Sequence, residues 1–189
     1  LRILEGEGQV EYTPHRGYQV PAPDPHDLFD IYRMRELLET EALLLGAERI
    51  DDDVVRTMEE AADEVTAAVE ARDNVAGTYA NHRFHLALLE TCGRPRLIRT
   101  IRHLWLSDAY RTVYFGDPVQ TDVSNRQHYE IIEAARRRDA DELLLLCNAH
   151  RDHALQMVLT ALEAQGELPD GEVPGEDAWR PRTITRLGA

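Results

Sequence analysis

Four polar residues occupy positions where the helical pattern of this sequence requires apolar side chains. They are Asn81, His85, His128 and His150. In the stretch "NHRFHLALLE" (residues 81–90), Asn81 and His85 lie one turn apart within a stripe that is otherwise phenylalanine and leucine. Burying an amide and an imidazole costs several kcal/mol unless each side chain has a partner. The chemistry of this set therefore depends on what the four side chains face.

Metal binding is the chemistry that best suits three histidines on separate helices. Facing helices of a bundle can bring such side chains to one ion. Neutral imidazole binds zinc, nickel, copper and iron, and an amide oxygen can serve as a harder ligand. Three histidines with one open position resemble a catalytic-type site more than a closed structural site. The alternative is that each histidine is a core residue that donates a hydrogen bond to a carbonyl group.

Arg35 lies on the apolar face of the first long helical segment. A buried guanidinium requires an anion. The anion can be structural, with Glu39 or Asp108 as the partner. It can equally be the carboxylate of a ligand, which arginine holds with two parallel hydrogen bonds. The sequence leaves both interpretations open.

Composition limits the class of protein. The 189 residues are 43% hydrophobic, which is enough for a core, and the formal net charge is −14. An acidic chain repels nucleic acid unless its basic groups are concentrated in one place. No apolar run is long enough to cross a membrane. Two distant cysteines, Cys92 and Cys147, predict no disulfide framework and suit the cytoplasm.

Three zones are expected along the chain. Residues 1–22 predict the end of a helix and a β-hairpin, whose turn contains Pro14 and Gly17. Residues 23–165 predict an all-α antiparallel bundle, and residues 166–189 predict an extended or disordered tail. The expected helices are 26–48, 51–72, 75–91, 95–115, 121–138 and 140–164. Leu155 and Leu159 lie on the far face of the last helix from His150, and are expected in a dimer seam or under the tail.

These segments resemble a known family. The stretch "LRILEGEGQVEYTPHRGYQV" resembles the last recognition-helix turns and the wing of a GntR-type winged helix-turn-helix. The stretch "DLFDIYRMRELLETEALLLGAE" resembles the opening helix of the FadR-type C-terminal ligand-binding domain. The stretch "NHRFHLALLE" is similar to that domain's metal motif. The stretch "HYEIIEAARRRDADELLLLCNAH" is similar to its closing motif, in which two ligand histidines have the spacing of His128 and His150.

The resemblance implies a dimeric bacterial transcription regulator, a repressor in the expected case, and six helices suggest its VanR-like branch. It implies a divalent metal ion, zinc first with nickel, manganese or iron as alternatives, that helps to bind a small carboxylate metabolite. The implied metal ligands are Asn81, His85, His128 and His150. Arg35 is the implied effector contact, and Arg16 and Gly17 form the wing tip that meets operator DNA.

Two features depart from that pattern. Asn81 replaces a more common aspartate, which removes one negative charge. The first two helices of the winged domain are absent, so we expect weak DNA binding by the chain as written.

Two other hypotheses stay open. The same four residues could serve a helical metalloenzyme, although the sequence nominates no clear general base and contains no GxSxG, P-loop, GxGxxG or HExxH motif. The histidines could also be structural, in a bundle whose role is dimerisation.

Overall fold

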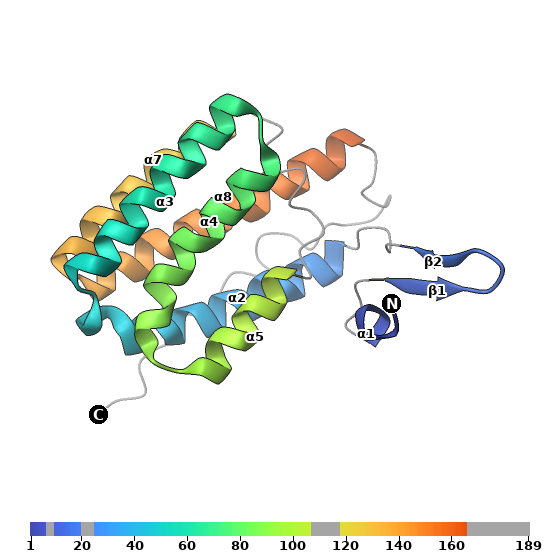
Figure 1. The fold of residues 1–189 in the computed structure, drawn as a ribbon, viewed down its shortest axis with the longest axis horizontal. Helices are drawn as coiled ribbons and strands as arrows, with labels where there is room; N and C mark the ends of the chain where they lie inside the picture. Colours follow the sequence, from blue (N-terminus) through green and yellow to red (C-terminus); the bar gives the residue numbers. More distant parts are fainter. Residues whose placement is uncertain (7–9, 20–24, 107–117, 166–189) are drawn as a thin grey trace.

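The computed structural model describes residues 1–6, 10–19, 25–106 and 118–165. Most of this part is a bundle of antiparallel helices (Figure 1). The helices are α2 (Pro25–Gly46), α3 (Asp52–Ala71), α4 (Asn74–Leu89), α5 (Pro95–Leu106), α7 (Pro118–Arg137) and α8 (Ala140–Gln165). The all-α prediction is confirmed, and each of the six expected helices is present. The predicted tail, the expected end of the fourth helix and Asp108 lie outside the described residues.

The N-terminal hairpin is also confirmed. After α1 (Arg2–Gly6), strands β1 (Glu11–Thr13) and β2 (Gly17–Gln19) pair antiparallel. Tyr12 is opposite Tyr18, with ring centroids 5.2 Å apart. Gly17 has a φ of 81°, a conformation that glycine adopts without a steric penalty. Figure 1 shows the hairpin beside the bundle, on the side from which α2 begins.

An Arg-Asp dipeptide forms each of two helix–helix turns. Arg72 and Arg138 end α3 and α7 in the left-handed conformation, with φ of 55° and 56°. Asp73 and Asp139 then cap α4 and α8 by accepting hydrogen bonds from the backbone N–H groups of the first turn. Such short connections make α3 and α4, and likewise α7 and α8, antiparallel neighbours.

A close contact fixes α2 against the segment that follows α4. A Cβ atom added to Gly46 would lie 2.8 Å from the backbone nitrogen of Cys92. After Gly46 come the 3₁₀ turn Ala47–Arg49 and the Arg49 guanidinium, which donates to the carbonyl groups of Thr91 and Cys92 at 3.2 and 2.8 Å. Because α2 carries Arg35 and α4 carries His85, this contact sets the spacing between two elements of the site.

The bundle is built from α3 packed on α4 and α7, with α8 packed on α7 and α2. The first half of α2 and the second half of α8 form a separate apolar cluster. Leu155 and Leu159 belong to it and are 0% and 9% exposed. The predicted seam on this face is therefore wrong, because α2 covers both leucines.

Candidate metal centre and adjoining pocket

Three histidines from three helices meet in the bundle interior. His85 lies on α4, His128 on α7 and His150 on α8, and their potential ligand atoms all lie within 4.8 Å of one another. The centroids of the His85 and His150 rings are 5.0 Å apart, and those of His128 and His150 are 4.8 Å apart. His128 and His150 are 1% and 7% exposed, and His85 is partly exposed. The predicted convergence of these side chains is confirmed.

His128 has an unusual environment for a buried imidazole. Both of its ring nitrogens are buried, and neither has a hydrogen-bond partner among the described residues. Burial lowers the pKa of His128 to about 3, so the ring is neutral at physiological pH. A neutral imidazole with an unused lone pair is the form that binds a metal ion. The donor set therefore fits a divalent ion.

His150 is oriented by a neighbour of His128 on α7. Its Nδ1 lies 2.9 Å from Oε1 of Gln127. With the Nδ1–H donating to that amide oxygen, Nε2 carries the lone pair. A hydrogen bond to the second nitrogen of this kind commonly orients a metal-binding histidine. Gln127 was not among the predicted residues, although it adjoins His128 in the sequence.

The other two imidazoles are also held neutral. Burial, followed by the charges of neighbouring groups including His128 and Arg35, lowers the pKa of His85 well below its usual value. Burial and the two neighbouring histidines do the same for His150. No proton has to leave these rings at neutral pH before an ion binds.

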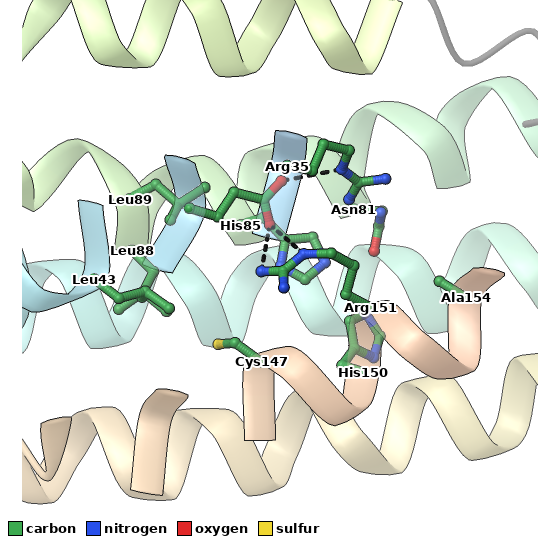
Figure 2. Close-up of a pocket in the computed structure, with 11 residues that line it drawn as sticks. Arg35, Leu43, Asn81, His85, Leu88, Leu89, Cys147, His150, Arg151 and Ala154 are labelled. Atoms are coloured by element: carbon green, nitrogen blue, oxygen red, sulfur yellow. Dashed lines mark hydrogen bonds and ion pairs between the residues drawn. The ribbon is translucent and has the colours of Figure 1, made fainter. Parts of the chain in front are cut away.

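A cavity of about 40 Å³ adjoins the histidines (Figure 2). Its lining residues are Arg35, Glu39, Leu43, Asn81, His85, Leu88, Leu89, Cys147, His150, Arg151 and Ala154. Figure 2 shows Arg35, Asn81, Arg151 and His150 around one part of this space, with Leu43, Leu88 and Leu89 on the other side. The cavity therefore has a polar part next to the histidines and an apolar wall. Asn81 is partly buried here, as predicted, and its role as a metal ligand stays a prediction.

In the polar part of the cavity, Glu39 accepts hydrogen bonds from both arginines. Its Oε1 accepts hydrogen bonds from Nε of Arg35 at 3.0 Å and from Nε1 of Trp105 at 2.8 Å. Its Oε2 accepts two from Arg151, from Nε at 3.0 Å and from Nη2 at 2.8 Å. Burial alone would raise the pKa of Glu39, but Arg151 and Arg35 outweigh it and lower that pKa to about 2. Glu39, which is ionised, is therefore confirmed as one structural partner of Arg35, while Asp108 lies outside the described residues.

Arg151 was missed in the sequence. It is 3% exposed, and its Nη1 also donates to Oδ1 of Asn148 at 2.7 Å. Its spacing carried a signal, because it lies four positions after Cys147 and three before Ala154 on the apolar stripe of α8. Trp105, which donates to Glu39, was likewise not singled out.

The remaining predicted residues lie elsewhere. Arg16 is exposed at the turn between β1 and β2, and Gly17 begins β2. Their contact with DNA stays a prediction. None of the described helices combines the length and the apolar character that crossing a membrane requires.

A family model described as the FCD domain matches residues 30–153, which contain the histidine cluster and both arginines of the pocket. The chain belongs to the FCD family. This domain is the C-terminal part of GntR-type transcriptional regulators, so the predicted GntR family is confirmed and the chain is a regulator of that type, while its VanR-like branch stays a prediction.

Relatives of the FCD chain are transcriptional regulators. The Nta operon transcriptional regulator of Aminobacter aminovorans is 25% identical over 161 residues, covering 84% of this chain and 74% of that protein. The HTH-type transcriptional regulator YdhC of Bacillus subtilis (strain 168) is 21% identical over 165 residues, covering 86% and 74%.

Solved structures share the fold. The McbR/YncC protein of E. coli has a TM-score of 0.76 at 18% identity, covering 84% of this chain and 76% of that one. A GntR regulator from Rhodococcus sp. RHA1 has a TM-score of 0.67 at 21% identity, covering 85% and 77%.

Proposed function

We propose that this FCD protein is a metabolite-responsive regulator in which a divalent metal ion anchors a small carboxylate effector. His85, His128 and His150 would hold the ion, with Asn81 as a fourth ligand. The observation that carries the proposal is the buried imidazole of His128, whose two nitrogens have no partner among the described residues. Zinc suits this set because it accepts imidazole and oxygen ligands at low coordination number.

The effector would bind in the adjoining cavity. A bound divalent ion attracts a carboxylate, and a guanidinium at Arg35 can hold a second part of the same molecule. Arg35 lines the cavity together with His85 and His150. We therefore expect a small anionic metabolite that spans the ion and the arginine.

Control of operator DNA would follow from a population shift. Arg35 and Glu39 lie on α2, the first helix of the bundle after the hairpin that carries Arg16 and Gly17. An effector that binds one arrangement of a homodimer more tightly than another shifts the equilibrium toward that arrangement. The size of the shift equals the difference between its two binding free energies. Such coupling free energies are typically about 1–3 kcal/mol, or roughly 5- to 150-fold in affinity.

The metalloenzyme hypothesis gains no support from the pocket. Among the described lining residues Glu39 is the carboxylate that could act as a general base. It accepts four hydrogen bonds from two arginines and a tryptophan, and its pKa of about 2 makes it a poor proton acceptor at neutral pH. The relatives are transcriptional regulators, which likewise favours a regulatory role over an enzymatic one.

Metal content tests the proposal. The protein would be purified without a chelator or a histidine tag and analysed by plasma mass spectrometry, beside a His128→Ala/His150→Ala double variant. His103→Ala is the matched control, because His103 is exposed on α5. We expect about one divalent ion per chain in the wild type and the control, and none in the double variant.

The opposite result is equally clear. If the wild type contains no metal, and added zinc or nickel does not raise its Tm, the metal anchor is wrong. The family assignment would stand, and the effector would then have to be recognised by the arginines alone.

A further inference from the structure

Gln127 contacts the histidine cluster from outside the set of metal ligands. Its Oε1 lies 2.9 Å from Nδ1 of His150. Neither nitrogen of His128 has a partner among the described residues, and the ring of His85 contacts other aromatic rings. Histidines that bind a metal usually donate their second N–H to a carboxylate, a carbonyl oxygen or water. The amide oxygen of Gln127 is placed to accept that bond from His150.

The packing of α7 against its neighbours fixes the position of Gln127. One turn before it, the hydroxyl of Ser124 donates to Sδ of Met157 on α8 at 3.8 Å. Two residues after it, the hydroxyl of Tyr129 donates to Oδ1 of Asp63 on α3 at 2.8 Å. These contacts hold α7 to both adjacent helices on either side of Gln127. A supporting residue on such a rigid element can orient a ligand precisely.

The hydrogen bond selects one tautomer of His150. A neutral imidazole carries one ring proton, which can lie on either nitrogen. Because the amide oxygen of Gln127 only accepts, a bond to Nδ1 requires the proton to lie there. The lone pair is then on Nε2, at the other side of the ring from Gln127. Without an acceptor at Nδ1 the proton can move to Nε2, where it would compete with a metal ion.

Gln127 is also neutral, which limits how strongly it acts on the ring. A carboxylate in the same place would attract the Nδ1 proton more strongly and would make Nε2 a more basic ligand. An amide orients the ring with a smaller effect on its basicity. A carboxylate at position 127 should therefore tighten metal binding, and an apolar side chain should weaken it.

We propose that Gln127 is a positioning residue of the metal site, whose amide oxygen keeps His150 in the Nδ1–H tautomer and thereby sets the affinity of the site for a divalent ion. The inference rests on the proposed metal-anchored function. Loss of a hydrogen bond of this kind typically weakens metal binding by roughly 10- to 100-fold.

Two substitutions and a matched control test the effect on affinity. Gln127→Leu removes the acceptor, and Gln127→Glu keeps an acceptor and adds a charge. Gln156→Leu makes the first of these changes at an exposed position of α8. Zinc affinity of the full chain would be measured by competition with a chromophoric chelator. We expect Gln127→Leu to bind zinc roughly 10- to 100-fold more weakly than the wild type, Gln127→Glu to bind it at least as tightly, and Gln156→Leu to match the wild type.

A second measurement reports the tautomer and needs no metal. Long-range proton–nitrogen correlation NMR on the metal-free protein distinguishes an imidazole protonated at Nδ1 from one protonated at Nε2. We expect the Nδ1–H form of His150 in the wild type and in Gln127→Glu, and we expect the Nε2–H form to appear in Gln127→Leu. A glutamine with a merely structural role would affect stability and leave this tautomer unchanged.

The outcomes separate this inference from the proposed function. If the wild type binds no zinc, the metal-anchored function is wrong and the inference falls with it. If the wild type binds zinc and Gln127→Leu binds it equally well, the inference alone is overturned. An Nε2–H ring at His150 in the metal-free wild type would also overturn it, because the amide would then donate to Nδ1. Weak zinc binding by Gln127→Glu would overturn it even if Gln127→Leu failed to fold.

Discussion

Replacing His128 with leucine is expected to stabilise the metal-free protein while abolishing its metal binding. The imidazole is 1% exposed, both of its nitrogens lack partners among the described residues, and its ring centroid lies 4.2 Å from that of Phe84. A buried polar group without a partner costs about 1–3 kcal/mol, and leucine removes that cost at similar volume. The free energy of unfolding of metal-free His128→Leu should therefore exceed that of the wild type by about 1–3 kcal/mol.

In the presence of zinc, the wild type should become more stable than His128→Leu. At a free zinc concentration about 1,000 times Kd, binding stabilises a protein by about 4 kcal/mol. The variant lacks one of three imidazoles and should gain far less. The wild type is then the more stable protein in zinc, and the variant is the more stable one in chelator.

Unfolding followed by circular dichroism measures the stability of both proteins, once in chelator and once in buffered zinc. For a domain of this size each kcal/mol shifts Tm by roughly 2–4 °C. His103→Leu on the exposed face of α5 serves as the control and should change stability by less than about 0.5 kcal/mol. A metal-free His128→Leu protein that is less stable than the wild type by more than about 1 kcal/mol would refute the reasoning. The His128 nitrogens would then have stabilising partners.

Three further predictions concern stability. Acid should destabilise the metal-free protein as pH falls below about 6.5, because the clustered histidines have depressed pKa values when folded and the unfolded chain binds more protons. Each of these histidines lowers the free energy of unfolding by up to roughly 1.4 kcal/mol per pH unit. A free energy of unfolding that stays constant from pH 7 to 5 would contradict this prediction. Gly46→Ala should lower the free energy of unfolding by about 1–3 kcal/mol, because its Cβ would collide with the backbone of Cys92, and chemical denaturation measures the loss. Arg138→Gly should raise the free energy of unfolding by up to about 1 kcal/mol, seen as a higher midpoint of the same denaturation curve, since Arg138 has a φ of 56°; an unchanged midpoint would mean that this conformation is unstrained.

Much of the site could be predicted from local sequence pattern. Helical periodicity determines which face of an element is apolar, and a polar residue on that face must be buried with a partner. This reasoning placed His85, His128 and His150 on the core-facing sides of three helices. The same periodicity, with turn residues, located the helices to within about a turn and the hairpin at its glycine, except that the expected end of the fourth helix lies outside the described residues.

The identity of the partners was beyond local pattern. Glu39 receives hydrogen bonds from Trp105, 66 positions away, and from Arg151, 112 positions away. The stripe of α8 contains Arg151, but spacing alone does not say which carboxylate would make its burial tolerable. Which charged side chains share the pocket is decided only when the helices that carry them pack together.

The sequence by itself determined the elements, their apolar faces and the set of buried histidines, because each of these depends on residues within a few turns of one another. Only the tertiary structure decided that α2 covers Leu155 and Leu159, and that two arginines share one glutamate beside the histidines. An apolar face must be buried, but which distant element buries it depends on packing across the whole chain.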